Sequence, residues 1–186
     1  MSIYFTSDLH FGHDRDFIYI PRGYKNFYEH DEDVVRRWNQ KINWNDDVYI
    51  LGDLMLGDNT YGRKILNQLN GQLHIIYGNH DTDVRKDIYN NLRNVVEIMG
   101  YAGILKYKKW HFYLSHYVTM TKNYDDTKKH LAQNLINLCG HIHTPDKFCE
   151  MRNGIMSYHV ELDAHSNEPI SIEEIIEDIK NFYGIR

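Results

Sequence analysis

Five short apolar runs in this sequence are each followed directly by side chains that can bind a metal ion. Acidic, amide or imidazole groups come after every run, in the blocks Asp8-Leu9-His10, Gly52-Asp53, Gly78-Asn79-His80-Asp81, His116 and Gly140-His141-Ile142-His143. In an open α/β sheet the carboxyl ends of the strands line one crevice. The pattern therefore predicts an α/β chain in which residues far apart in the sequence converge at one place.

The spacing within these blocks suits ligands. Asp8 and His10 stand two positions apart, as do His141 and His143, and in extended backbone such residues point the same way. Leaving His80 aside, the blocks offer two carboxylates at strand ends, one amide oxygen and four imidazoles. This exceeds the ligands of one tetrahedral zinc site and includes no thiolate. Two metal ions account for the donors better than one.

Apolar periodicity predicts alternating strands and helices in the first half. Strands are expected at residues 2–6, 48–51 and 73–77, and helices at 31–42 and from Ile65 to Gly71. This βαβαβ order favours parallel strands covered by helices.

The second half reads differently. Residues 104–107 and 111–115 flank a hairpin turn, and residues 156–162 form another strand. Cys139 ends a buried strand, whereas Leu131, Leu135 and Ile136 fit a helix. Ser171 and Glu174 predict a capping box for a last helix, whose apolar stripe ends at Phe182.

Length and charge bear on the number of domains and on the kinds of partner that the protein can bind. The 186 residues most simply form one domain, residues 1–186. The formal charge of −5 argues against broad attraction to nucleic acid, and no stretch approaches the ~20 apolar residues that span a bilayer. No signal peptide is recognised at the N-terminus. We expect a cytoplasmic protein with reduced cysteines, without membrane insertion or stable nucleic-acid binding; the sequence does not indicate its oligomeric state.

Taken in order, the five blocks resemble the signature of the calcineurin-like metallophosphoesterases: DxH, GD, GNH with D or E, a lone H, and GHxH. The resemblance runs through residues 1–183, and the chain looks most similar to the compact bacterial, archaeal and phage-type phosphoesterases. It implies an α/β fold of the α+β kind, a four-layer αββα sandwich with two mixed β-sheets. The elements predicted above agree with this fold and equally with a three-layer one.

The resemblance also implies a dinuclear metal site. Its ligands would be Asp8, His10 and His143 for one ion and Asn79, His116 and His141 for the other, with Asp53 bridging both. Mixed imidazole and carboxylate donors suit transition metals better than Ca or Mg. We expect two divalent ions, Mn or Fe in the first place, with Zn, Co or Ni as alternatives.

The chemistry implied by the resemblance is hydrolysis of a phosphate ester. A hydroxide bridging the two ions would attack phosphorus directly, and His80 would act as the general acid that protonates the leaving alkoxide. Asp81 either orients His80 or anchors the turn. His13 either reaches a phosphate oxygen or the surroundings of the metal ligands, which makes it a substrate-binding candidate, or caps the following segment. Arg15 is favoured as a surface residue.

The residues that follow the GD block bear on the class of substrate. The arginine that phosphoprotein phosphatases of this family carry shortly after GD is missing, because Leu54-Met55-Leu56-Gly57 stand there. This departure argues against phosphoprotein substrates. The resemblance to the compact phosphoesterases, which often cleave phosphodiesters, implies a phosphodiester substrate, from a small phosphate-ester molecule or nucleotide. The alternatives are a phosphomonoesterase, a non-catalytic interaction module, and a two-metal hydrolase of another bond. Five histidines without a motif position receive no role: His74, His111, His130, His159 and His165.

Overall fold

The first sheet contains four parallel strands, which alternate with helices along the chain, and one short antiparallel strand. The computed structural model describes residues 1–119, 135–150 and 156–184. The strands are β1 (Ile3–Thr6), β2 (Asp47–Leu51), β3 (Gln72–Ile76) and β4 (Val95–Gly100), and the short β10 (Ile170–Ser171) adds antiparallel to β1. Because β1, β2 and β3 are parallel, their carboxyl ends lie along one edge.

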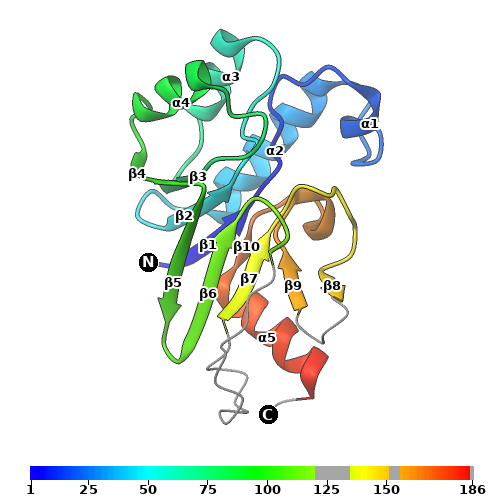
Figure 1. Ribbon diagram of the computed structural model, residues 1–186. Helices are drawn as coiled ribbons and strands as arrows, with labels where there is room; N and C mark the ends of the chain where they lie inside the picture. Colours follow the sequence, from blue (N-terminus) through cyan, green and yellow to red (C-terminus); the bar gives the residue numbers. More distant parts are fainter. Residues whose placement is uncertain (120–134, 151–155, 185–186) are drawn as a thin grey trace.

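Helices cover one face of this sheet (Figure 1). They are α2 (Phe27–Lys41), α3 (Asn59–Leu66) and α4 (Asp83–Asn90), and a short α1 (Asp16–Tyr19) precedes them. Asn26 and Asp58 start α2 and α3, since each side chain accepts a hydrogen bond from a first-turn backbone N–H. Apolar side chains of α2 and α3, such as Trp38 and Leu66, are fully buried in one cluster with β2 and β3.

The chain passes directly from β4 into a second sheet. Its strands are β5 (Ala102–Tyr107), β6 (Trp110–Ser115), β7 (Leu135–Cys139), β8 (Phe148–Glu150) and β9 (Met156–His159), in the order β5-β6-β7-β9-β8. The pairs β6–β7 and β7–β9 are parallel, and the two outer pairs are antiparallel. Both sheets are therefore mixed, and the predicted fold with two mixed sheets is confirmed.

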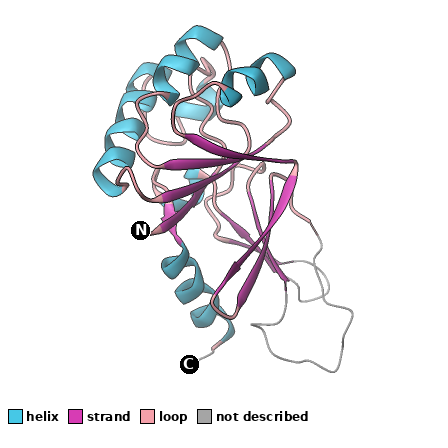
Figure 2. Cartoon of the chain, turned by 90° about the vertical axis from the view of Figure 1, so that its left-hand side faces the viewer, coloured by secondary structure: helices cyan, strands magenta, loops and turns pink. Residues whose placement is uncertain are grey.

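A second apolar cluster joins the two sheets and the last helix. Phe5 of the first sheet, Phe112 and Leu138 of the second, and Ile175 of α5 (Ile172–Tyr183) belong to it. Figure 2 shows α1–α4 on one side of the first sheet and the second sheet on the other, with α5 near the C-terminus. The predicted capping box at the start of α5 is present.

Three details of the sequence prediction were wrong. The strand expected over residues 156–162 ends at His159, and Leu162 begins a 3-10 helix. Leu135 and Ile136 lie in β7, not in a helix, while Leu131 lies outside the described residues. The run from Leu135 to Cys139 is short and apolar except for Asn137, so helical spacing and a buried strand fit it equally. The helix expected to reach Gly71 ends at Leu66, and Leu69 is buried in the loop that follows.

None of the described helices has the length and apolar character that crossing a bilayer requires.

Candidate metal centre

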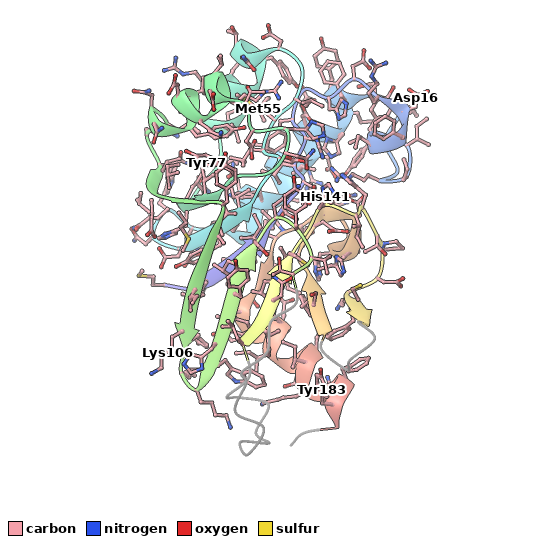
Figure 3. The ribbon with its side chains drawn as sticks, in the orientation of Figure 1. Asp16, Met55, Tyr77, Lys106, His141 and Tyr183 are labelled. Atoms are coloured by element: carbon pink, nitrogen blue, oxygen red, sulfur yellow. The ribbon has the colours of Figure 1, made fainter. Side chains whose placement is uncertain are left out.

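The strand ends bring the five polar blocks together. Asp8 follows β1, Asp53 follows β2 and Asn79 follows β3, while His116 and His141 come directly after β6 and β7 of the second sheet. Figure 3 shows His141 just beyond the end of β7. The edge of the first sheet and the ends of β6 and β7 thus face a common space, as the sequence predicted.

One cluster of candidate ligands contains Asp8, His10 and His143. Nε2 of His10 lies 3.1 Å from Nε2 of His143, and Oδ1 of Asp8 lies 3.8 and 3.6 Å from these two nitrogens. The three atoms are close enough to share one ion. They are the ligands that the family resemblance implies for the first metal.

A second cluster contains Asn79, His116 and His141. Nε2 of His116 lies 2.9 Å from Oδ1 of Asn79 and 3.1 Å from Nδ1 of His141. Nδ1 of His116 lies 2.9 Å from the carbonyl oxygen of Leu51. When it donates to this oxygen, the lone pair of Nε2 is directed toward Asn79 and His141, as a metal ligand requires.

Asp53 lies between the two clusters. Its Oδ2 is 3.9 Å from Nε2 of His10 and 3.4 Å from Nε2 of His116. Its Oδ1 accepts a hydrogen bond of 2.8 Å from the backbone N–H of His80. One carboxylate oxygen therefore faces ligands of both candidate ions.

The backbone of five candidate ligands has an unusual conformation. Their φ angles are positive, between 51° and 80°, at Asp8, His10, Asp53, His141 and His143. Residues with a Cβ rarely adopt this region, and such strain gathers at functional sites, where the surrounding structure holds it. Here the backbone N–H groups of Asp8 and His10 donate to the carbonyls of Gly52 and Asp53, both at 3.0 Å.

Two glycines leave room for the carboxylates. A Cβ on Gly78 would collide with Oδ1 of Asp53, and a Cβ on Gly140 would collide with Oδ2 of Asp8 and Oγ of Ser7. The glycines of the GNH and GHxH blocks are therefore required because the ligands approach their backbone closely.

The burial of the first cluster fits a bound cation. Asp8 is fully buried and His10 is 2% exposed, yet Oδ1 of Asp8 has no hydrogen-bond partner among the described residues. Burial raises the pKa of Asp8 to about 6, against the charges of His116 and His143. Burial and nearby positive groups lower the pKa of His10, so its imidazole is neutral at pH 7. A divalent ion would give Asp8 Oδ1 the partner it lacks, and neutral imidazole is the form that binds metals.

Asp163, which the sequence reasoning missed, contacts His143 on the side of the imidazole opposite to the candidate metal-binding nitrogen. Its Oδ2 lies 3.1 Å from Nδ1 of His143. Burial lowers the pKa of His143, but its hydrogen bond to Asp163 and the charge of Asp8 outweigh this and raise it. A carboxylate that accepts from Nδ1–H fixes the tautomer in which Nε2 can bind a metal. Asp163 lies in the 3-10 helix Leu162–His165, four residues after the end of β9, so the strand-end pattern did not identify it.

Arg22 is the second residue that the sequence reasoning missed. Its buried guanidinium donates from Nε and Nη2 to Asp163, at 3.1 and 2.7 Å, and from Nη2 to the carbonyl of Asp8 at 2.8 Å. Nη1 lies 3.0 Å from Nε2 of His30. Arg22 therefore ties the segment after β1 to the residue behind His143. Its position in a loop after Pro21 gave no signal of this.

Asp81 anchors the turn that carries His80. Its Oδ2 accepts from the backbone N–H groups of Asp53 and Gly78, at 2.9 and 2.7 Å, and its Oδ1 accepts from the hydroxyl of Tyr89 at 2.7 Å. Both oxygens are thus used on the GD and GNH blocks. Of the two roles left open for Asp81, these contacts favour the anchor.

His80 and His13 lie beside the first cluster. The ring centroids of His80 and His10 are 5.6 Å apart, and those of His13 and His10 are 5.3 Å apart. Burial, with the positive charges of His80 and Arg15, lowers the pKa of His13 to about 4. Nδ1 of His13 has no hydrogen-bond partner among the described residues, and no side chain caps α1. His13 therefore faces the site and does not cap the next segment.

The histidines without a motif position have other surroundings where the structure describes them. His74 lies 3.0 Å from Asp47 and 2.9 Å from Glu97, and His165 lies 2.8 Å from the carbonyl of His159. His130 lies outside the described residues. Arg15 is exposed, as expected.

Comparisons with known proteins identify the family. The model of the calcineurin-like phosphoesterase superfamily domain matches residues 1–159. An uncharacterized protein of Methanocaldococcus jannaschii is 30% identical over 188 residues, which cover 99% of this chain and 94% of that protein. The gene 66 protein of Mycobacterium phage D29 is 30% identical over 203 residues, which cover 96% of this chain and 98% of that protein.

A solved structure shares the fold. A protein of unknown function from Aquifex aeolicus matches with a TM-score of 0.67 at 23% identity, over 95% of this chain and 98% of that one. The family match and the two clusters of candidate ligands together support a metal-dependent phosphoesterase. The chain belongs to the calcineurin-like phosphoesterase superfamily.

Proposed function

We propose that residues 1–186 act as one domain that hydrolyses a phosphodiester with two divalent metal ions. The position of Asp53 is the observation that carries this proposal. Its Oδ2 lies within 4 Å of an imidazole nitrogen in each cluster, His10 at 3.9 Å and His116 at 3.4 Å. A single carboxylate oxygen in this position suits a bridge between two ions.

The residues present fit two ions. Asp8, His10 and His143 would hold one ion, Asn79, His116 and His141 the other, and Asp53 would contact both. Two bound ions would lower the pKa of a water molecule for attack on phosphorus and would neutralise charge on the phosphate oxygens. Mn or Fe suits these donors, with Zn, Co or Ni as alternatives.

His80 would protonate the oxygen of the leaving group. Its backbone is fixed on both sides, because its N–H donates to Asp53 and its carbonyl accepts from Arg85. Its imidazole lies beside that of His10 at the first cluster. His13, on the same side, would donate a hydrogen bond to a phosphate oxygen.

The cations around the site favour a diester over a monoester. A diester carries one negative charge, whereas a monoester dianion gains from an additional guanidinium. The side chains of Arg22 and Arg85 reach the site residues, but both are already bound: Arg22 to Asp163 and two carbonyls, and Arg85 to Asn59 and the carbonyl of His80. All three nitrogens of the Arg22 guanidinium are therefore used, and Nε and Nη1 of Arg85 are used as well, which leaves few donors for a second negative charge.

Hydrolysis of two aryl esters tests this function. With added Mn²⁺ the protein should release p-nitrophenolate from bis(p-nitrophenyl) phosphate, and chelator should stop the release. The monoester p-nitrophenyl phosphate should react with a lower kcat/KM. Asp53→Asn should lose most of the activity, whereas the matched control Asp87→Asn, an exposed carboxylate on α4, should keep it. Equal rates for wild type and Asp53→Asn would refute the proposal.

A further inference from the structure

Two exposed aromatic side chains flank the candidate metal centre. Tyr117 is 48% exposed and Phe17 is 69% exposed. Tyr117 directly follows His116, and Phe17 is the second residue of α1, four residues after His13. Large apolar side chains that stay exposed beside a polar site commonly mark a ligand surface.

Tyr117 lies against the second cluster. The edge-on contacts of its ring have centroid distances of 5.1 Å to His116 and 4.7 Å to His141. Its carbonyl accepts hydrogen bonds from Ser115 at 2.8 Å and from Thr119 at 3.1 Å. The ring is therefore held in place while about half of the residue is open, so a planar group could stack on it at a small cost in conformational entropy.

Phe17 belongs to the opposite side of the site. Its ring meets that of His13 edge to face, with the centroids 5.6 Å apart, and His13 in turn lies beside His10 of the first cluster. A phosphate group between the two clusters would therefore have Phe17 beyond one end and Tyr117 beyond the other.

The position of His80 distinguishes the two sides. In the hydrolysis, water loses a proton to solvent and its oxygen bonds to phosphorus, while the bond to the leaving oxygen breaks. The leaving oxygen takes the proton of His80, and His80 regains a proton from solvent. The ring of His80 contacts His10, at the cluster next to His13 and Phe17. The leaving group is then on the Phe17 side, and the group that stays on phosphorus is on the Tyr117 side.

We propose that the substrate is a phosphodiester whose retained group carries a planar aromatic ring, such as a nucleoside, which stacks on Tyr117, while Phe17 contacts the leaving group. This inference rests on the proposed function and adds which phosphodiesters the site prefers. Stacking of a base on an aromatic side chain accounts for roughly 5- to 150-fold in affinity, so removal of the Tyr117 ring should be measurable.

Two substrates with the same leaving group test the assignment. Thymidine 5′-(p-nitrophenyl phosphate) retains a nucleoside, and methyl p-nitrophenyl phosphate retains only a methyl group. Tyr117→Ala should lower the ratio of their kcat/KM values about tenfold, and Tyr117→Phe should restore the ratio. Phe17→Ala should lower both kcat/KM values by the same factor and leave the ratio unchanged. The matched control Tyr101→Ala, exposed on the loop between β4 and β5, should change neither.

A binding measurement supports the kinetics. Thymidine 5′-monophosphate is the product that keeps the retained group, and calorimetry should show about tenfold weaker binding to Tyr117→Ala than to wild type. An unchanged substrate ratio and unchanged product affinity in Tyr117→Ala would overturn this inference while wild-type hydrolysis of both esters upholds the proposed function. Absence of hydrolysis of either ester by the wild type with Mn²⁺ would overturn both.

Discussion

Nε2 of His10 and Nε2 of His143 lie 3.1 Å apart, although 133 positions separate the two residues in the sequence. Two imidazole nitrogens at this distance need a proton or a cation between them, because their lone pairs would otherwise repel each other. Burial lowers the pKa of His10, whereas, against burial, the hydrogen bond to Asp163 and the charge of Asp8 raise the pKa of His143. In the metal-free site a proton between the two nitrogens therefore belongs to His143. Asp8, whose Oδ1 lies 3.6 Å from His143, adds a negative charge at the same point. A divalent ion would replace this proton and would have Asp8 Oδ1 as a third ligand.

Metal removal should destabilise the folded protein. An ion that binds only the folded state at 100 times its Kd adds about 2.7 kcal/mol to the free energy of unfolding, which for a chain of this size is roughly 5–10 °C in Tm. Thermal unfolding in Mn²⁺ and in chelator measures the difference. Asp53→Asn should show a smaller shift than wild type. Identical Tm values in both buffers would contradict metal binding at this site.

Gly140→Ala should impair metal binding by displacing Asp8. The added Cβ would collide with the Asp8 carboxylate and with Ser7, both of which are buried. The matched control is Gly103→Ala, whose Cβ would meet the mobile end of the Met99 side chain. Calorimetric titration of the metal-free variants with Mn²⁺ should show a large loss of affinity in Gly140→Ala only. Similar affinities in both variants would mean that Asp8 does not depend on this close approach.

Asp163→Asn should weaken metal binding without removing a ligand. The neutral amide no longer holds His143 by a charge-assisted bond, and loss of such a partner typically costs 10- to 100-fold in metal affinity. It also leaves the buried Arg22 guanidinium without its carboxylate, so the free energy of unfolding should fall by about 3 kcal/mol. Mn²⁺ titration and urea unfolding measure the two effects. Wild-type affinity in the folded variant would exclude the positioning role.

His165 should make stability depend on pH. Burial lowers its pKa to about 4 from an ordinary value of 6.5, so the unfolded chain takes up a proton at a higher pH than the folded one. This contribution to stability is full above pH 6.5 and is lost as the pH falls toward 4, by about 2 kcal/mol between pH 7 and pH 5. His165→Gln, which can still donate to the carbonyl of His159, should lose less stability over this range. If the free energy of unfolding changed with pH in the same way in wild type and in His165→Gln, His165 would not be the source of the pH dependence.

The candidate ligands at the strand ends could be predicted from the sequence, but the residues that hold these ligands in place, Arg22 and Asp163, could not. Apolar runs such as Ile3–Phe5 locate strands, and parallel strands place the following residues at one edge, so Asp8 and Asp53 were expected to meet. Arg22 lies in a loop without periodicity, and its contact with Asp163 joins positions 141 apart. Only tertiary packing creates such a contact.

Local ambiguity explains the error at Leu135. The run from Leu135 to Cys139 has one polar residue, Asn137, which is too little to reveal its period. Its parallel pairing with β6 and β9 decides the strand.

The number of Mn²⁺ ions bound at saturation tests the central claim most directly. Equilibrium dialysis of the metal-free protein should give two ions per chain for wild type and fewer for Asp53→Asn, because Asp53 faces ligands of both clusters. A wild-type value of one or zero, or the same value of two for Asp53→Asn, would contradict a dinuclear centre bridged by this residue.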